Sequence, residues 1–270
     1  MLNKKTKGKK GLVGIKLDMA KAYDRIEMDF LSNTLLTTGF PNNLVMTIMK
    51  CVSSVSFSVL INGQPTTTFT PQRGLRQGDP LSPYLFILCA EVLSGLLLKS
   101  QEGGLFHGLK IANNAPPISH LFFADDSVVF CRANTEEAQE LTKIFKLYQN
   151  ASGQKINMDK SEMCFSKNTR LQDRLRFRQW MPIKITERIT KYLGIPAYVG
   201  RSKQQIFNHL IDKIRAKLKG WKERHLSFAG RAILIKAVAQ AMSTYIMSCF
   251  MLPQGICDQI ESLISQFWWG

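Results

Sequence analysis

Three aspartates in apolar surroundings are the residues of this chain best suited to chemistry. Asp125 and Asp126 stand side by side between a Phe-Phe pair and an apolar run, and Asp18 follows the apolar run 12–17. Burying carboxylates is costly unless a cation neutralises them. Three such acids at strand ends or turns fit the hard ions Mg²⁺ or Mn²⁺, and two ions about 4 Å apart would support phosphoryl transfer. The alternative is an Asp-Asp hairpin turn, since Asp tolerates turn geometry.

The patterns around these acids predict the strands that must position them. Residues 12–17 are apolar and rich in β-branched side chains, which predicts a buried strand that ends at Asp18. Residues 118–123 and 128–132 read as two strands on either side of 124–127. The acids are therefore expected at strand ends or turns.

Helices and turns fill the rest of the chain. Apolar spacing predicts buried or amphipathic helices around 30–35, 44–52, 85–96, 141–148, 207–218, 234–242 and 256–267, with Asn134 and Ser227 as N-caps. Strict alternation from Val55 to Ile61, followed by Asn62-Gly63, predicts a β-hairpin. Residues 73–83 are rich in Gly and Pro and predict a loop. The chain is thus expected to be α+β up to about residue 200 and helical afterwards.

Charge is unevenly distributed along the 270 residues. The net charge is +16, with 36 Lys and Arg against 20 Asp and Glu. Residues 11–160 carry 13 basic and 13 acidic residues, whereas residues 161–236 carry 18 and 5. A neutral chemical region beside a basic region suggests a polyanion such as nucleic acid or an acidic membrane surface.

Other site classes are poorly supported. The six cysteines include no C-x-x-C pair, which argues against zinc and favours a reducing compartment. The N-terminus has no apolar core of a secretion signal. The longest apolar run, 84–98, is about 15 residues and contains Glu91, so we expect no membrane span.

Five segments then resemble the motifs A to E of reverse transcriptases, in the family's order. They are KLDMAKAYDRI (16–26), RGLRQGDPLSPYLF (73–86), FFADDS (122–127), SGQKINMDKSE (152–162) and KYLGIP (191–196). The forms of the second and third are similar to those of LINE-type (non-LTR) retrotransposons, plant-like ones in particular. Residues 220–238 and FWWG (267–270) resemble the region that follows in such elements.

The resemblance implies an RNA-directed DNA polymerase, a nucleotidyltransferase that adds deoxynucleotides to a primer 3′-hydroxyl with two Mg²⁺ ions (or Mn²⁺). Asp18, Asp125 and Asp126 would be the catalytic metal ligands, and Lys160 would protonate the leaving pyrophosphate. The nucleotide-binding residues would be Tyr23, which excludes a ribose 2′-hydroxyl, with Arg76, Gln77 and Gly78. Instead of contacting phosphate, Arg76 and Arg73 could form ion pairs with Asp79 or another acid. Instead of donating a proton, Lys160 could be a solvated lysine on a turn.

Nucleic-acid contacts are expected farther along the chain. By resemblance, Tyr192, Leu193 and Gly194 form a hairpin that holds the primer end. The basic residues expected on the nucleic-acid backbone are Lys213, Arg215, Lys217, Lys219, Lys222, Arg224, Arg231 and Lys236. The tryptophans Trp221, Trp268 and Trp269 are expected in a core or an interface rather than stacked on bases.

The implied architecture is the polymerase right hand. We expect a basic tail at 1–13, a palm of antiparallel sheet packed on helices at 14–200, and a truncated helical thumb at 201–270. The fingers that precede motif A in the family would be largely absent, as would the endonuclease of a parent polyprotein. RNA template, DNA primer and deoxynucleoside triphosphates would be the partners, without a membrane, and the location intracellular, in the nucleus. The alternative function is an inactive fragment that retains nucleic-acid binding.

Overall fold

The computed structural model describes residues 8, 10–112, 114–124, 126–189, 191–193, 195–196, 204–222 and 226–270. The chain divides into two compact units, Met1–Ile189 and Thr190–Gly270. This division lies before the KYLGIP segment, whereas the sequence pattern suggested a change of character near residue 200.

A five-stranded sheet of order β4-β5-β1-β6-β7 forms the centre of the first unit. The strands are β1 (Leu12–Asp18), β4 (His120–Phe123), β5 (Asp126–Arg132), β6 (Glu162–Phe165) and β7 (Lys184–Thr186). Adjacent strands are antiparallel except β6 and β7, which are parallel. The two predicted strands are confirmed, but β5 begins at Asp126, so Asp126 and Ser127 belong to the strand and not to the expected turn 124–127. In β1, Val13, Ile15 and Leu17 are fully buried, whereas Lys16 and Asp18 are more exposed, as expected for side chains on opposite faces of a strand.

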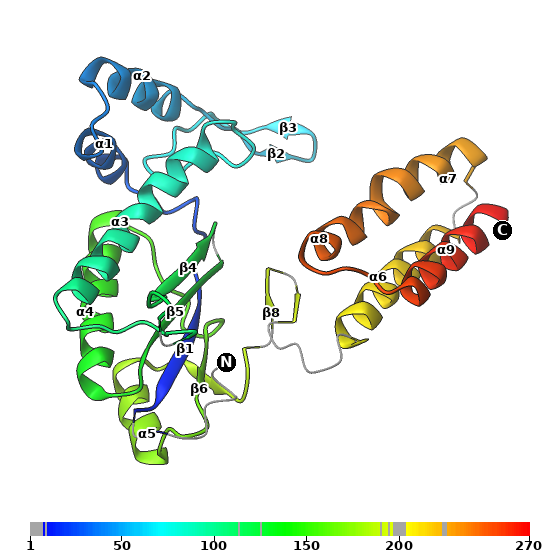
Figure 1. Cartoon of the computed structure of the whole chain (residues 1–270). Helices are drawn as coiled ribbons and strands as arrows, with labels where there is room; N and C mark the ends of the chain where they lie inside the picture. Colours follow the sequence, from blue (N-terminus) through cyan, green and yellow to red (C-terminus); the bar gives the residue numbers. More distant parts are fainter. Residues whose placement is uncertain are drawn as a thin grey trace. The chain divides into compact units, whose positions relative to one another are not determined.

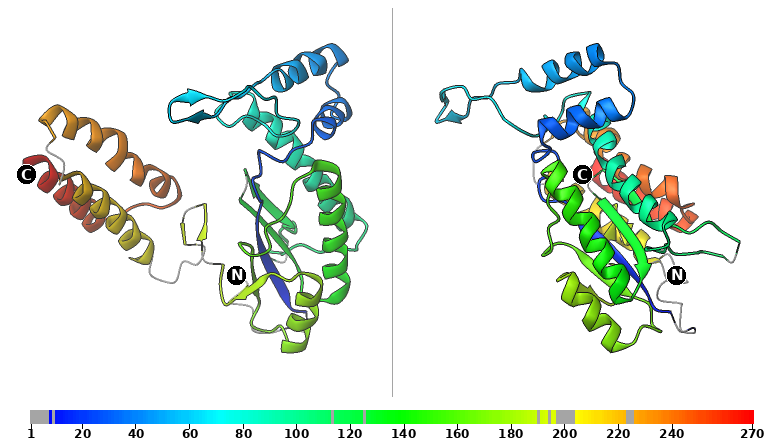
Figure 2. Two further views of the ribbon diagram at one scale, coloured as in Figure 1. Left: turned by 180° about the vertical axis from the view of Figure 1, so that it is seen from behind. Right: turned by 90° about the vertical axis from the view of Figure 1, so that its left-hand side faces the viewer.

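Helices α3 (Ser82–Glu102), α4 (Thr135–Ser152) and α5 (Leu171–Trp180) lie along one face of this sheet (Figure 1; Figure 2). Leu97 of α3, Leu141 of α4 and Phe177 of α5 share a fully buried core with the β1 side chains. Lys16 and Asp18 alternate with those core residues, so they point to the other face of the sheet. The helical layer thus fixes which face carries the acids.

The second group of helices packs on the first half of α3. It comprises α1 (Met28–Thr37) and α2 (Asn42–Ser53), whose Leu31, Leu35 and Val45 share a core with Leu85 and Cys89. The buried stripe of α3 is therefore centred on Leu85, Cys89, Leu93 and Leu97 rather than on the expected Leu88, Val92 and Leu96, which are partly buried. The stripe passes from one core to the other along the helix: Leu85 and Cys89 pack with α1 and α2, and Leu93 and Leu97 pack with the sheet.

The predicted hairpin is confirmed, with Asn62 and Gly63 both at positive φ, 51° and 84°. Its strands, β2 (Leu60–Ile61) and β3 (Gln64–Pro65), are only two residues long and are exposed. The alternation before Asn62 therefore does not mark a buried face, because nothing in the described part of this unit covers Leu60 and Ile61.

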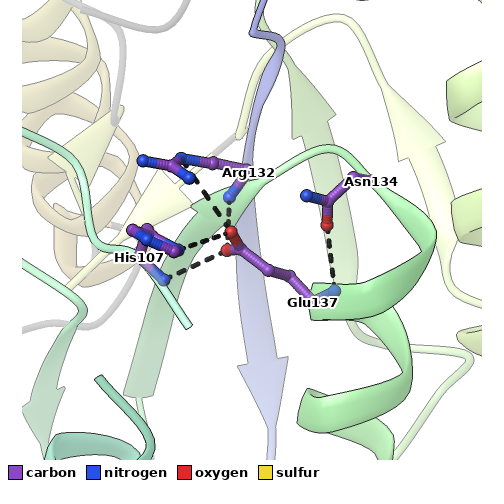
Figure 3. Close-up of polar contacts among 4 residues, drawn as sticks. All are labelled: His107, Arg132, Asn134 and Glu137. Atoms are coloured by element: carbon purple, nitrogen blue, oxygen red, sulfur yellow. Dashed lines mark hydrogen bonds and ion pairs between the residues drawn. The ribbon is translucent and has the colours of Figure 1, made fainter. Parts of the chain in front are cut away.

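The start of α4 is stabilised by two side chains (Figure 3). Asn134 is the N-cap, and its Oδ1 accepts a hydrogen bond from the Glu137 backbone N–H at 2.9 Å. The buried Glu137 carboxylate accepts bonds from the backbone N–H groups of Arg132 (2.9 Å) and His107 (3.1 Å), and lies 2.9 Å from His107 Nδ1. The expected cap is confirmed, and Glu137 in addition joins the loop after α3 to the end of β5.

Two helical stretches of the described residues are long and apolar enough to cross a membrane, Ser82–Glu102 and Phe228–Cys249, with mean hydropathies of 1.5 and 1.3. The first is α3, which is longer than the apolar run seen in the sequence. Helices in the core of a globular protein meet the same criterion, and α3 packs on two cores.

The second unit is helical, apart from a hairpin of β8 (Lys191–Tyr192) and β9 (Ile195–Pro196). Its helices are α6 (Gln204–Lys222), α7 (Phe228–Leu234), the π-helical turn η2 (Ile235–Ala239), α8 (Ala241–Cys249) and α9 (Gln254–Trp269). Phe207, Ile214 and Phe267 belong to its core. Ser227 caps α7 as predicted, its Oγ accepting a bond from the Gly230 N–H at 3.2 Å.

Candidate active site

Two of the three expected acids face each other across neighbouring strands. Asp18 at the end of β1 is the register partner of Asp126 at the start of β5, and Asp125 lies outside the described residues. Directly opposed like charges destabilise an antiparallel pair, so this arrangement calls for a positive charge nearby. The Lys16 ammonium provides one, with Nζ 3.3 Å from Asp126 Oδ1.

A cavity of about 660 Å³ opens beside Asp18. It is lined by Asp18, Met19, Ala20, Lys21, Ala22, Tyr23, Gln77, Gly78, Ser82, Pro83, Asn157 and Lys160. Five residues predicted from three separate segments of the sequence thus line one cavity: Asp18, Tyr23, Gln77, Gly78 and Lys160. The volume suits a ligand of nucleotide size.

Arg76 is the predicted nucleotide-binding residue that does not line this cavity. It lines a smaller cavity with Cys51 and Asp79. For the nearby Arg73, the alternative role of an ion pair with an acid is confirmed, because Arg73 Nη1 lies 3.5 Å from Glu27 Oε1.

Backbone hydrogen bonds hold the Gln77-Gly78 loop against the segment after Asp18. Gly74 N–H donates to Ile26 O and Leu75 N–H donates to Tyr23 O, both at 2.8 Å. Gly74 has φ +93°, and a Cβ there would lie 2.8 Å from the Asp24 backbone oxygen. Glycine is required at this position because two main chains touch and the backbone is left-handed.

The Tyr23 ring is held by stacking. It lies on the Phe86 ring of α3 with centroids 4.6 Å apart and an interplanar angle of 11°. Parallel stacking of this kind restricts the ring to one orientation in the cavity wall.

The segment 155–161 is bound to the end of β1 through residues that the sequence analysis did not single out. Asn157 N–H donates to Asp18 O at 2.8 Å, and Asp18 N–H donates to Ser161 Oγ at 3.1 Å. The fully buried Ser161 in turn donates to Asn157 O at 2.6 Å. Lys160 lies exposed on this turn, its backbone N–H donating to Asn157 Oδ1 at 3.3 Å.

Gln154 was also missed and is 3% exposed. Its Nε2 donates to Ala22 O at 2.9 Å, and its Oε1 accepts a bond from the Tyr148 hydroxyl at 2.6 Å. Burial raises the pKa of Tyr148 above its ordinary value, so the hydroxyl stays a donor. One amide therefore connects α4 with the turn that carries Tyr23. A lone Gln after a helix carries no signal for this in the sequence.

In the second unit, Tyr192 of the expected primer hairpin pairs with Ile195, and Leu193 has φ 51°. Gly194, Arg224 and the Lys222 side chain lie outside what the structure describes. The predicted basic residues with exposed side chains are Lys213, Arg215, Lys217, Lys219 and Lys236, and Arg215 is 3.2 Å from Asp212. Arg231 is partly buried and donates to Trp268 O at 2.8 Å, so it holds the end of α9.

Comparison with known proteins shows the family of the chain. Residues 2–197 match the family described as reverse transcriptase (RNA-dependent DNA polymerase). The chain belongs to the reverse transcriptase family. The family is one of RNA-directed DNA polymerases, which are nucleotidyltransferases, and the resemblance seen in the sequence is confirmed.

The relatives of this reverse transcriptase domain are proteins of non-LTR retrotransposons and plant proteins. It is 28% identical over 268 residues to the transposon TX1 uncharacterized 149 kDa protein of Xenopus laevis. It is 33% identical over 150 residues to the Pol polyprotein of the retrotransposable element R2DM of Drosophila melanogaster, and 63% identical over 68 residues to an uncharacterized mitochondrial protein of Arabidopsis thaliana. These matches cover 96%, 56% and 25% of this chain but only 19%, 13% and 56% of the three relatives.

Reverse transcriptases generally use divalent metal ions, and the acids found here suit such ions. Asp18 and Asp126 offer hard oxygen donors at adjacent strand ends, the ligand type that Mg²⁺ and Mn²⁺ prefer. No group of three His, Cys, Asp or Glu side chains gathers among the described residues, which do not include the expected third acid, Asp125.

Proposed function

We propose that the chain catalyses RNA-templated DNA synthesis, in which a primer 3′-hydroxyl attacks the α-phosphorus of a deoxynucleoside triphosphate and pyrophosphate leaves. The observation that carries the proposal is the single cavity lined by Asp18, Tyr23, Gln77, Gly78 and Lys160. Those residues come from motifs A, B and D of the family, and Asp126 of motif C faces Asp18.

Each part of the cavity has a role in this reaction. Asp18 and Asp126, with Asp125, would hold two divalent ions, which supply charge stabilisation for the attacking and leaving oxygens when bound. The backbone at Gly78, with φ +90°, would pack on the incoming nucleotide together with Gln77. Tyr23 would contact the sugar and exclude a 2′-hydroxyl.

Lys160 would donate a proton to the leaving pyrophosphate oxygen as the bond to the α-phosphorus breaks. Its exposed position at the cavity wall leaves the ammonium able to reach a bound triphosphate. A general acid is useful there because the leaving group gains negative charge.

The two units would take the roles of palm and thumb. The first unit contains the sheet and the cavity, and the second contributes exposed Lys213, Lys217 and Lys219 on α6. Lysines on one helix would contact phosphates of a primer–template duplex, while Arg231 would serve the fold instead. RNA template, DNA primer and deoxynucleotides are accordingly the proposed partners.

Primer extension on poly(rA)/oligo(dT) with Mg²⁺ tests the function. We expect Asp18→Asn to lose at least about a hundredfold in rate, because an oxygen ligand at the reacting centre loses its charge. Asp29→Asn, which changes an exposed acid of α1, is the control and should keep the parent rate. Equal extension by Asp18→Asn and the parent would refute the assigned site. Salt-dependent nucleic-acid binding without any extension by the parent would favour the binding-only alternative.

A further inference from the structure

Lys16 lies on the face of the sheet that carries Asp18 and Asp126. It precedes Asp18 by two residues on β1, so both side chains point to the same face of the sheet. Its Nζ lies 3.3 Å from Asp126 Oδ1, diagonally across to β5, and Lys16 and Asp126 side chains are only 21% and 33% exposed. On its other side, Lys16 is the register partner of Glu162 on β6.

This position gives Lys16 an electrostatic task. Asp18 and Asp126 are direct register partners, and two carboxylates in that relation repel each other. A half-buried ammonium next to them offsets the repulsion more strongly than a fully solvated one, because water and salt screen it less. A divalent ion held by the same carboxylates would offset the repulsion as well, and would itself be repelled by Lys16.

We propose that Lys16 is a positioning residue that serves as an internal counter-ion. It neutralises the Asp18–Asp126 pair while no divalent ion is bound, and it releases Asp126 when an ion binds. The four-carbon stem of lysine allows this exchange, since the ammonium can move without a backbone change. The inference rests on the proposed function, because that function places divalent ions at these acids.

The test compares Lys16→Met with the parent in the full chain, in EDTA and in saturating Mn²⁺. In EDTA we expect a melting temperature lower by about 2 °C, and in Mn²⁺ we expect no difference. Mn²⁺ affinity, measured by electron paramagnetic resonance of the free ion, should increase roughly fivefold because a competing charge is removed. Lys184→Met is the matched control, since Lys184 is an exposed lysine of β7 in the same sheet, and it should change neither quantity.

Repeating the Lys16→Met substitution in the Asp126→Asn variant distinguishes a counter-ion role of Lys16 from a role in packing alone. In Asp126→Asn the opposed pair of carboxylates is gone and only Asp18 and Glu162 remain near Lys16, so adding Lys16→Met should lower the melting temperature in EDTA by less than it does in the parent. An equal loss in EDTA, in Mn²⁺ and in the Asp126→Asn background would overturn the inference. An Mn²⁺ affinity that is the same in Lys16→Met and in the parent would also overturn the inference. If the parent extends primers, the proposed function would still stand in that case. The expected Mn²⁺ results in a parent that cannot extend primers would support the inference and refute the function.

Discussion

Tyr23 shows at the scale of one residue how the cavity could select its substrate. Its ring is fixed by stacking on Phe86 and forms part of the wall next to Asp18. We expect Tyr23→Val to raise ribonucleotide incorporation relative to deoxynucleotide incorporation by roughly tenfold or more, because the ring that would collide with a 2′-hydroxyl is gone. Competing primer-extension assays measure the ratio. Tyr23→Phe keeps the ring and should keep the parent ratio, and a parent-like ratio in Tyr23→Val would contradict the role.

Gln154 acts at the same scale through its buried amide. Replacing it with Leu leaves Ala22 O without its side-chain donor, while the Tyr148 hydroxyl loses its 2.6 Å acceptor and keeps only its bond to Cys89 O at 3.2 Å. Buried polar groups left unpaired cost about 1–3 kcal/mol, so Gln154→Leu should lower the free energy of unfolding by that amount in urea denaturation. Gln172→Leu, at an exposed site on α5, is the control and should stay within about 0.5 kcal/mol. Equal effects of the two substitutions would show that the buried contacts contribute little.

At the scale of elements, backbone hydrogen bonds join the loop 73–78 to the segment 23–27, and both segments contribute residues to the cavity. Gly74→Ala would force a Cβ to 2.8 Å from the Asp24 backbone at φ +93°, and we expect it to lower the free energy of unfolding by more than about 1 kcal/mol. Gly95 is the matched glycine, within α3 and with open space around a Cβ. Gly95→Ala should instead raise stability by up to about 1 kcal/mol, since Ala favours helix. Urea denaturation of both variants checks the prediction, and a neutral Gly74→Ala would contradict the close contact.

Elements also show which sequence patterns were informative. The strands around Ala124, the Asn62-Gly63 hairpin and the caps Asn134 and Ser227 were predicted because each depends on a few neighbouring residues. The buried stripe of α3 was shifted, because it is set by two separate cores that only the fold brings to that helix. Ser161 was missed for a related reason, since it bonds to Asp18, 143 positions away.

At the scale of the whole molecule, the net charge of +16 is shared unequally between the residues of the two units. The second unit carries 11 Lys and Arg against 4 Asp and Glu within 81 residues. Lys213 and Lys217 lie one helical turn apart and exposed on α6. If both contact phosphates, Lys213→Gln with Lys217→Gln should reduce the slope of log binding constant against log salt by about 2.

Fluorescence anisotropy of a labelled primer–template duplex over a salt series measures that slope. Lys143→Gln is the control, because Lys143 is a solvated lysine of α4 with a side chain 77% exposed. It should leave the slope unchanged. A slope that falls equally with Lys143→Gln would mean that net charge, rather than α6, governs binding.

The sequence alone determined the family of this protein and five of the residues that line its cavity, because chemistry demands particular residue types at short spacings. Asp18, Tyr23, Gln77 and Gly78 lie in such segments, which can be read without knowing the fold. Only the tertiary structure decided how the segments meet. Strand register sets Asp126 opposite Asp18, and it places Lys16 Nζ 3.3 Å from Asp126 Oδ1. A shift of one residue would turn these side chains to the other face of the sheet. The register depends on how the helices pack against β1, and contacts between such distant segments cannot be read from a local sequence pattern.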